Sequence, residues 1–587
     1  MSINNGYLEK DLVSLEDVFS KGPYLAEYPR PQFKRDSYLS LNGAWDIVIS
    51  QKDVLPLSYP EKVNVPFALE SPLSGVNHLV EPDEILFYHK IVSLEEDFIK
   101  DSDTLLLHFE GVDQEAEVYI DNNKVGEHIG GYTPFTIELS SSLPSQFSLV
   151  VKVKDKTDSS YHQRGKQVLN PSGWFYSSSS GIYKPVWIEA VKKGYLKSVK
   201  FTPDYDKKSI KVKVESDSSS PIHMSLEGRE VLLESDVEKE IPLLSFHPWS
   251  TEDPYLYPVT LSNDVDQVET YFGMRKMEIR EVDGFKRLYF NDKPLFLTGL
   301  LDQGYYFLGN LTPQSYEDYK FDILKSKEAG FNFLRIHVKS EIPMFYYYAD
   351  KLGILLLQDF PCGGEPYDFV SVVKPRFHYF SEKDIPLKKV GRENPDGQKE
   401  FESEVKEYLS LTYNNPSVIA YTLFNEGWGE FRPSYFYDLC KSIDPTRLYD
   451  SSSGWYEANK SDFFSIHTYS IPDMKRKNRY QRCFALTEIG GVGYKVEDHT
   501  YFPKFYGHGK VKSQEELEKK VKDLYEKKVL PQIKEHGLSM VVYTQLSDCE
   551  TELNGLFTFD RKVEKINPAL FKKLNEELQD EYQKLFR

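Results

Sequence analysis

The strongest constraint on the fold is a repeat of short apolar runs and helical segments after residue 285. Eight runs follow one another: PLFLTGLL, FNFLRIH, ILLLQDF, VIAYTLFNE, LYDSSSGW, DFFSIHTY, FALTEIGG and SMVVYTQLSD. Helical patterns over 313–329 and 343–351 separate the first three runs. Eight strand–helix repeats over a span of this size predict a TIM (β/α)8 barrel over residues 281–587. Chemistry in this fold takes place where the strands end, so the residues that close each run are the functional candidates.

Residues 1–192 carry a different pattern, in which short alternating strands are separated by Gly, Pro and Asn turns. The segments TLLLHF (104–109), AEVYI (116–120) and FSLVVKV (147–153) are typical of it. This pattern predicts a jelly-roll β-sandwich. Residues 193–280 contain about seven shorter strand-like runs, among them SIKVKVES and YPVTLSN, which predict an immunoglobulin-like β-sandwich.

Charge and composition argue against several kinds of partner. The chain has 72 basic and 91 acidic residues, and its net charge of −19 disfavours nucleic acid and anionic membranes as partners. The four cysteines show no CxxC spacing, and no HExxH or complete phosphate-binding loop occurs, so we assign no metal or cofactor. The N-terminus is acidic where a signal peptide is cationic, and no apolar stretch reaches the about 18 residues of a membrane span. We therefore expect a cytoplasmic protein, and leave a homo-oligomer open.

Two acidic residues stand out at the strand ends. Glu426 closes VIAYTLFNE and Glu488 closes FALTEIGG, which would be strands four and seven of the barrel. These strands face each other across the barrel mouth, so the two carboxylates can flank one bond. Neighbouring carboxylates separate their pKa values, and glycoside hydrolysis needs one protonated and one ionised group. The alternative is that each is a surface residue at a helix start. The glycine that follows each of them, directly or after one residue, argues against that.

Six segments resemble glycoside hydrolase family 2, the family of β-galactosidases, β-glucuronidases and β-mannosidases, and they occur in the family's order. Three resemble its sugar-binding jelly roll: YLSLNGAWD (38–46), FEGVDQEAEVYIDNNKVGEHIGGYTPF (109–135) and GWFYSSSSGIYKPVWIE (173–189). WSTEDPYLYPVTL and YFGMRKMEI resemble the end of its immunoglobulin-like domain. NNPSVIAYTLFNEGWG (414–429) is similar to its acid/base segment, and LTEIGG (486–491) is similar to its nucleophile segment. The resemblance extends over nearly the whole chain.

The resemblance implies that Glu426 is the general acid/base and that Glu488 is the nucleophile. It also implies that Asn425 binds the sugar 2-hydroxyl and that Tyr469 donates a hydrogen bond to the nucleophile. An ordinary barrel aromatic is the alternative for the tyrosine. Arg335 matches an arginine that holds the nucleophile carboxylate, and such a pair would keep Glu488 ionised.

Other strand ends supply further candidates for substrate binding. His467 either contacts the sugar or packs as a satisfied histidine. Leu301-Asp302-Gln303 replaces the His-Glu pair that the family often shows after strand one, which makes Asp302 a candidate hydroxyl ligand. His337 closes strand two, and Asp359 closes strand three, where a structural helix cap is the alternative.

Strand eight departs from the family's pattern, which commonly has a Trp as the floor of the sugar site. The segment YTQLSDCE supplies Tyr543 and Gln545 instead, so Trp428 and Trp455 are the candidates for that platform. The segments 361–412 and 492–512, after strands three and seven, are long enough to wall a pocket.

The expected function is that of a retaining exo-β-glycosidase acting on a carbohydrate substrate. A β-galactoside is the first choice, because it is the commonest activity of the family, and a β-glucuronide, β-mannoside or other β-glycoside is the alternative. The Asn-x-Lys pair with which the family's glucuronidases grip a carboxylate occurs at 122–124 and 291–293 but not within 545–565. A non-catalytic carbohydrate-binding protein and a transglycosylase are the rivals. A retaining enzyme requires its carboxyl groups to lie about 5–5.5 Å apart.

Overall fold

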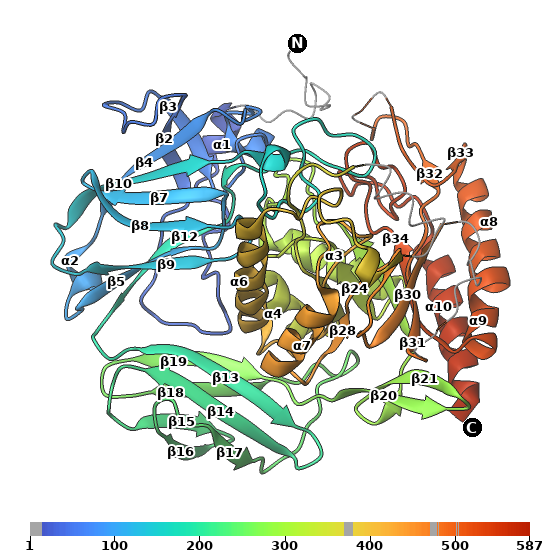
Figure 1. The fold of residues 1–587 in the computed structure, drawn as a ribbon. Coiled ribbons are helices and arrows are strands. Elements are labelled where there is room, and N and C mark those ends of the chain that lie inside the picture. The colour runs from blue at the N-terminus through green and yellow to red at the C-terminus, as the bar shows by residue number, and fades with distance from the viewer. Residues whose placement is uncertain are drawn as a thin grey trace.

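Two β-sandwiches lie beside a barrel of parallel strands that is ringed by helices (Figure 1). The computed structural model describes residues 15–368, 380–469, 478, 481–500, 502 and 504–586. Within these residues the expected fold class is confirmed: sandwich sheets come first, and a nearly closed eight-stranded parallel barrel follows.

The first sandwich pairs a four-stranded sheet with a six-stranded sheet. The four-stranded sheet runs β1 (Leu39–Ser40), β12 (Val186–Val191), β5 (Thr104–Phe109), β9 (Phe135–Ser140). The six-stranded sheet runs β3 (Glu61–Val65), β2 (Gly43–Ser50), β4 (Ile85–Ser93), β10 (Gln146–Lys154), β7 (Glu115–Ile120), β8 (Asn123–Ile129). Strand β7 buries every second side chain, because one face of the sheet packs on the core.

The second sandwich contains the seven strands that its sequence predicted. One sheet runs β13 (Leu196–Asp204), β14 (Ser209–Ser216), β17 (Lys239–Pro242), and the other runs β16 (Arg229–Leu233), β15 (Ile222–Leu226), β18 (Tyr257–Ser262), β19 (Gln267–Phe272). A small sheet of β20 (Met277–Val282), β21 (Phe285–Phe290) and β22 (Lys293–Pro294) then packs its apolar side chains into the core inside the barrel. This sheet closes the end of the barrel where the strands begin.

The barrel strands are parallel and lie beside their neighbours in the chain. In chain order they are β23 (Leu297–Asp302), β24 (Phe333–Ile336), β25 (Leu355–Asp359), β27 (Val418–Thr422), β28 (Leu448–Asp450), β30 (Phe463–Thr468), β31 (Cys483–Gly490) and β34 (Leu538–Thr544). Every residue of β25 and of β27 is buried, since helices cover one face and the barrel interior the other. This accounts for the continuous apolar runs of the sequence.

The helices around the barrel follow local sequence signals. They are α3 (Tyr316–Glu328), α4 (Pro343–Leu352), α6 (Pro395–Thr412), α7 (Pro433–Ile443), α8 (Gln514–Leu524), α9 (Leu530–Glu535) and α10 (Pro568–Gln583). Helix α3 begins with a capping box between Ser315 and Asp318, and α4 has Pro343 in its first turn and ends at Gly353, whose φ is 73°. The helices predicted over 313–329 and 343–351 therefore match α3 and α4.

A long loop of the first sandwich reaches over the barrel (Figure 1). It follows β10 and is called here the 155–180 loop. Its residues bond to the segment after β34: Tyr176 donates to Glu552, and the backbone N–H of Ser177 donates to Glu550 at 2.8 Å. These contacts fasten a segment of the first sandwich to the open end of the barrel.

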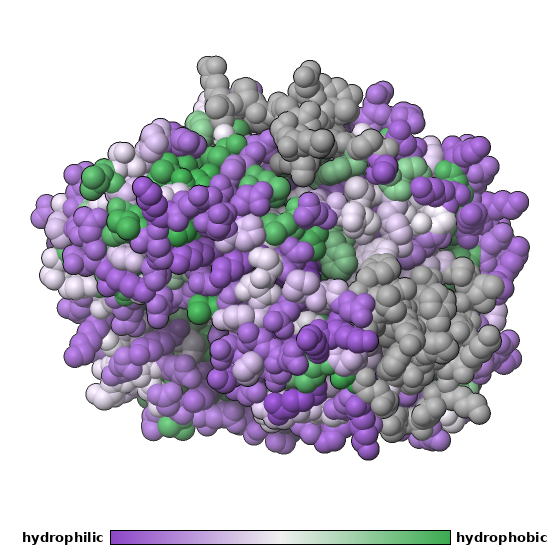
Figure 2. Space-filling view, turned by 45° about the horizontal axis from the view of Figure 1, so that its top comes forward, coloured by the Kyte–Doolittle hydropathy of each residue, from purple (hydrophilic) through white to green (hydrophobic). Residues whose placement is uncertain are grey.

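The outer surface in the view of Figure 2 is mostly hydrophilic, with small scattered hydrophobic areas. Among the described residues, no helix is both long enough and apolar enough to cross a membrane.

A buried carboxyl on α6 provides a stability prediction. Glu404 is 3% exposed, and neither of its oxygens has a hydrogen-bond partner among the described residues. Burial raises the pKa of Glu404 well above its ordinary value, and the charges of Glu400 and Glu407 add to the rise. The folded chain therefore holds this proton more tightly than the unfolded chain, so its contribution to stability is lost as pH rises through the folded-state pKa.

Glu404→Gln removes this loss of stability at high pH, because the amide stays neutral at every pH. We expect the Tm of the variant to exceed that of the wild type by about 2 °C or more at pH 8, and by less at pH 5. Thermal unfolding at both pH values measures this. An equal difference at the two pH values would show that Glu404 is not held protonated by the fold.

Candidate active site

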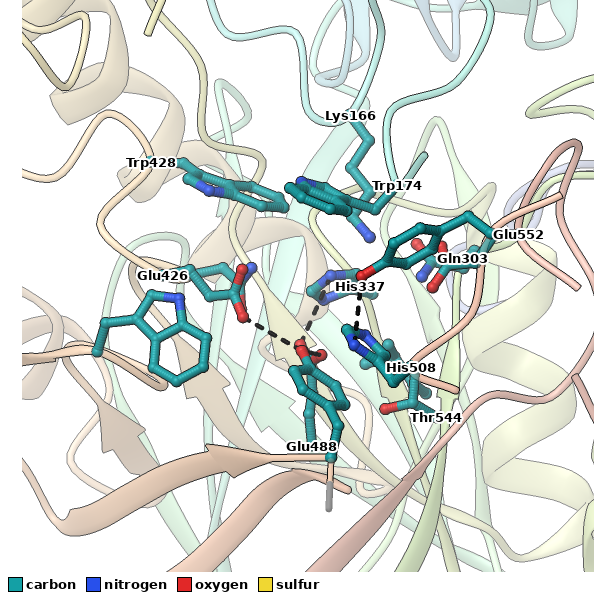
Figure 3. A pocket seen from close by; sticks show the side chains of 15 residues that line it. Lys166, Trp174, Gln303, His337, Glu426, Trp428, Glu488, His508, Thr544 and Glu552 are labelled. Atoms are coloured by element: carbon teal, nitrogen blue, oxygen red, sulfur yellow. Dashed lines mark hydrogen bonds and ion pairs between the residues drawn. The ribbon is translucent and has the colours of Figure 1, made fainter. Parts of the chain in front are cut away.

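A pocket opens at the end of the barrel where the strands finish. Side chains from the barrel and from the 155–180 loop meet in it (Figure 3). The lining residues are Lys166, Trp174, Leu301, Gln303, His337, Asn425, Glu426, Trp428, Trp455, Tyr469, Glu488, Tyr506, His508, Thr544 and Glu552.

The two predicted glutamates meet in this pocket. Glu426 follows β27 in a left-handed conformation, with a φ of 52°, and Glu488 lies within β31. Gly427 comes next with a φ of 81°, and a side chain there would collide with the ring of Tyr456 at 2.1 Å, so the turn requires glycine. One carboxylate oxygen of each glutamate lies within 4.8 Å of the other.

Tyr469 bridges the two carboxylates. Its hydroxyl donates to Glu488 Oε2 at 2.7 Å and lies 3.3 Å from Glu426 Oε1. Burial raises the pKa of Tyr469 well above its ordinary value, and both glutamate charges add to the rise, so the hydroxyl keeps its proton and acts as a donor. The ring of His508 stacks on the tyrosine with centroids 3.4 Å apart, which fixes the orientation of the donor.

Arg335 organises the floor beneath the pocket. Its Nε donates to both oxygens of Asp359, at 3.0 and 3.1 Å, and its Nη1 lies 3.3 Å from Glu488 Oε1. Its Nη2 donates to Asn425 Oδ1 at 2.9 Å. Because a guanidinium only donates, the amide oxygen of Asn425 must face it, and the amide nitrogen is left for the pocket.

The resemblance implied that Arg335 keeps Glu488 ionised, but in the structure the pKa of Glu488 lies above its ordinary value. Burial raises the pKa of Glu488 above its ordinary value, and the charge of Glu426 raises it further. His467, Arg335 and Lys166 oppose the rise but do not reverse it. Arg335 therefore reduces the rise in the pKa of Glu488 but does not cancel it.

His337 is a neutral acceptor at the pocket wall. Burial lowers its pKa well below the ordinary value, and the charges of Lys166 and Arg335 lower it further. Its Nδ1 lies 2.8 Å from Asp359 Oδ2, so the single ring proton is directed to that carboxylate. The Nε2 atom is left as an acceptor, which a sugar hydroxyl can use.

Several polar atoms of the pocket have no hydrogen-bond partner within the described ranges. They are Asn425 Nδ2, both amide atoms of Gln303, Trp428 Nε1 and Thr544 Oγ1. Buried polar groups are nearly always paired in native proteins, so a set of such atoms around one cavity indicates a hydroxyl-rich ligand.

Four predicted substrate contacts lie behind the pocket wall instead of in it. Asp302 is buried, and its Oδ1 accepts from the backbone N–H of Gly304 at 2.8 Å. Side chains alternate along a strand, so Leu301 and Gln303 face the pocket and the aspartate between them does not. Arg335, Asp359 and His467 also line no part of the pocket and instead hold residues that do.

The other predicted contacts do line the pocket: Asn425, Tyr469, His337, Trp428 and Trp455 join the two glutamates there. Neither Tyr543 nor Gln545, which stand on strand eight in place of the family's Trp, lines the pocket. Tyr543 packs on Phe571 of α10, with ring centroids 5.0 Å apart, and Gln545 donates to Asn554 at 2.8 Å. Thr544, between them, faces the pocket.

Sequence reasoning missed the residues that distant segments bring to the pocket. Lys166 and Trp174 come from the 155–180 loop, and Glu552 follows β34. Of the two predicted walls, the segment 492–512 contributes Tyr506 and His508, whereas 361–412 contributes no lining residue within its described part. Residues 369–379 of the segment 361–412 lie outside the described ranges. No local spacing marks Lys166, since only the docking of the sandwich on the barrel brings it there.

Glu426, His467 and Glu488 are the one group of His, Cys, Asp or Glu side chains in the described residues whose spacing would admit a metal ion. His467 already contacts both glutamates, and Tyr469 lies between the two carboxylates. We therefore interpret the group as one that shares protons and assign no metal to it.

Two β-sandwiches in front of a TIM barrel, with two neighbouring carboxylates at its open end, define a multidomain barrel protein with a glycosidase-type carboxylate pair. Comparison with protein families agrees. Residues 40–189 match the sugar binding domain of glycosyl hydrolases family 2, and residues 194–275 match the following domain of glycosyl hydrolases family 2. These two matches, over residues 40–189 and 194–275, support glycoside hydrolase family 2.

Relatives in sequence carry two different activity names. A β-galactosidase of Thermoanaerobacterium thermosulfurigenes is 26% identical over 401 residues, which cover 62% of this chain and 50% of the relative. A β-glucuronidase of Bacteroides fragilis is 26% identical over 392 residues, which cover 60% of this chain and 52% of the relative. The chain thus spans about half the length of these relatives.

Solved structures share the fold over nearly the whole chain. A β-glucuronidase of Ruminococcus gnavus superposes with a TM-score of 0.72 at 18% identity, covering 94% of this chain and 99% of the other. A family 2 β-galacturonidase of Eisenbergiella tayi bound to galacturonate gives a TM-score of 0.69 at 19% identity, with coverages of 94% and 99%.

Proposed function

We propose that the chain is a retaining exo-β-glycosidase. The observation that carries this proposal is that a carboxylate oxygen of Glu426 lies within 4.8 Å of one of Glu488, in a pocket where several buried polar atoms have no hydrogen-bond partner among the described residues. Glu488 attacks the anomeric carbon while Glu426 protonates the departing oxygen. Water that is deprotonated by Glu426 then releases the sugar with its β configuration retained.

The surrounding contacts support these two roles. Glu488 receives a hydrogen bond from Tyr469 and faces Arg335, both of which stabilise a carboxylate. Asn425 presents its amide nitrogen to the pocket beside the acid/base, where a bond to the sugar 2-hydroxyl would strengthen in the transition state.

A panel of aryl β-glycosides tests the proposal: galactoside, glucuronide, galacturonide, glucoside, mannoside, fucoside and xyloside. We expect at least one to be cleaved, with the β anomer as the first product in a proton NMR time course. An α anomer formed first would overturn the retaining mechanism. Binding of a sugar without turnover of any glycoside would favour a carbohydrate-binding protein, and transfer to an added alcohol in place of hydrolysis would favour a transglycosylase.

For the glycon, we propose a β-galactoside first and a β-uronide second. Lys166 favours the second candidate: it is 7% exposed, points into the pocket in Figure 3, and forms no ion pair with a described residue. A buried ammonium gains most from an anionic partner, and a uronic acid carboxylate would supply one.

Lys166→Met discriminates between the two glycons. If the substrate is a β-uronide, we expect kcat/KM on the aryl uronide to fall by about 10–100-fold, because one charge-assisted hydrogen bond is lost. Any activity on the uncharged aryl galactoside should change far less. Preference of the wild type for the galactoside, with an equal response of both substrates to the substitution, would remove the uronide from consideration.

A further inference from the structure

Glu552 brings a third carboxylate into the pocket. It lies in the segment after β34, is 2% exposed and lines the pocket. Figure 3 shows Glu552 on the side of the pocket opposite Glu426. The proposed mechanism does not use this carboxylate, so the chemistry at the anomeric carbon does not account for its place there.

Neighbouring side chains hold Glu552 in one position without neutralising its charge. Tyr176 donates to Oε2, and burial together with the charge of Glu552 raises the pKa of Tyr176 well above its ordinary value, so the hydroxyl keeps its proton. Asn554 Nδ2 donates to Oε1 at 2.9 Å, and Asn554 Oδ1 accepts from Gln545 at 2.8 Å, which fixes the orientation of the amide. Both oxygens thus accept from neutral donors, as those of a carboxylate do, and each keeps a lone pair that can accept from a ligand.

Gln303 presents amide atoms on the same side of the pocket. It is 5% exposed, and neither Oε1 nor Nε2 has a hydrogen-bond partner within the described ranges. Figure 3 shows Gln303, like Glu552, opposite Glu426. Because buried amides are nearly always paired, these two atoms indicate a ligand that both donates and accepts hydrogen bonds, as hydroxyl groups do.

Lys166 limits the charge that such a ligand can carry. Its Nζ lies 5.3 Å from the centroid of the Tyr176 ring, and the hydroxyl of the same tyrosine donates to Glu552. A carboxylate on the ligand would be attracted by Lys166 and repelled by Glu552, and an amine would meet the reverse. A hydroxyl can accept from the ammonium and donate to the carboxylate, so a neutral sugar suits both groups.

The catalytic carboxylates determine which part of the sugar lies near Glu552. Glu426 and Glu488 act at the anomeric carbon, C1. In a pyranose ring the hydroxyls at C3 and C4 lie across the ring from C1, on the side away from the leaving group. Glu552 and Gln303 line the side of the pocket that is opposite the acid/base, where these hydroxyls would lie.

We propose that Glu552 is a specificity-determining residue: its carboxylate accepts hydrogen bonds from the hydroxyls at C3 and C4 of the glycon and selects a neutral sugar over a uronic acid. A uronic acid carries its carboxylate on C5, beside C4, and would bring a second negative charge toward Glu552. The inference rests on the proposed function and favours the β-galactoside over the β-uronide as its substrate.

Glu552→Gln tests the role, because the amide has nearly the shape of the carboxylate but no charge. On the neutral aryl glycoside that the wild type cleaves best, we expect kcat/KM to fall by about 10–100-fold, since a charge-assisted hydrogen bond is lost. On an aryl galacturonide or glucuronide we expect kcat/KM to rise by about tenfold, since the repulsion is gone. On a 3,4-dideoxy analogue of the neutral substrate, the variant and the wild type should differ by less than about twofold, because the partners of Glu552 are absent.

Two further variants separate recognition of the sugar from attachment of the 155–180 loop. Glu550→Gln is the matched control: Glu550 is buried, accepts from the backbone N–H of Ser177 and lines no part of the pocket, so the variant should keep wild-type rates on both substrates. Tyr176→Phe removes the bond between the loop and Glu552 but keeps the carboxylate, so it should change both substrates in the same direction. Opposite changes on the two substrates in Tyr176→Phe, like those expected for Glu552→Gln, would assign the effect to the loop and overturn the inference.

Binding of free sugars gives a readout that does not depend on turnover. Titration calorimetry should show that the wild type binds galactose more tightly than galacturonate, and that Glu552→Gln narrows or reverses this order. A wild type that prefers the uronic acid, or a folded Glu552→Gln variant with an unchanged ratio between the neutral and the acidic sugar, would contradict the role of Glu552. Absence of any turnover by the wild type would instead count against the proposed glycosidase, and calorimetry would still decide whether Glu552 selects a neutral sugar.

Discussion

Glu488→Gln is expected to lower kcat/KM by about 10³-fold or more on every glycoside that the wild type cleaves. The amide cannot attack the anomeric carbon, yet it has the shape of the carboxylate and can still meet Tyr469 and Arg335. Initial rates on the best aryl glycoside measure the loss. A substrate analogue should bind the variant about as tightly as the wild type, because the pocket is otherwise intact.

Glu404→Gln is the matched control for this substitution, since it replaces by its amide another buried glutamate that lines no part of the pocket. It should retain wild-type activity. The raised pKa of Glu488 also places the acid limb of the wild-type pH profile above the ordinary range of a glutamate, because the nucleophile must be ionised. Wild-type activity in Glu488→Gln would show that another group is the nucleophile.

Glu426→Gln should affect substrates according to how much their leaving groups need a proton. On alkyl and phenyl glycosides we expect a loss of about 10²–10⁴-fold, because the general acid is absent. On a dinitrophenyl glycoside the first step should stay fast and the second should slow, since no base activates water. Stopped-flow absorbance should then show a burst of about one dinitrophenolate per chain, and azide, which needs no base, should restore the steady rate.

Glu430→Gln is the control for the acid/base substitution. Glu430 lies four residues further on, is buried, and bonds to Ser452, and burial raises its pKa to about 8, so that it is largely neutral already. Its amide variant should cleave all leaving groups at wild-type rates. An equal loss on dinitrophenyl and alkyl glycosides in Glu426→Gln, without a burst, would contradict the assignment of Glu426 as the acid/base.

The architecture of this protein can be predicted from its sequence, because it depends on local patterns. The apolar run around β25 is buried on both faces, as a central parallel strand requires, and β7 and β15 alternate as half-buried antiparallel strands do. Helix α3 carries its own capping box. Each of these signals lies within a few residues, so the sequence displays it directly.

The two glutamates could also be found in the sequence, because strand order alone brings the ends of strands four and seven together across a barrel. The sequence does not show which side chains at those strand ends point into the pocket. Asp302 follows Leu301 on the same strand end, but the pleat turns it away from the pocket, whereas Gln303 faces in. A shift of one residue along the strand decides which side chain faces the pocket, and neither composition nor a motif shows that position.

The sequence by itself determined the order of the domains, the barrel and the pair of carboxylates, because each depends on periodicity or on residues close in the chain. Only the tertiary structure decided what surrounds that pair. Lys166 and Trp174 enter the pocket because a loop of the first sandwich is tied to the segment after β34. His467 contacts the two carboxylates and lines no part of the pocket, because its ring lies behind the pocket wall under Trp455. Contacts between segments hundreds of residues apart, and the burial they produce, exist only once the chain has folded.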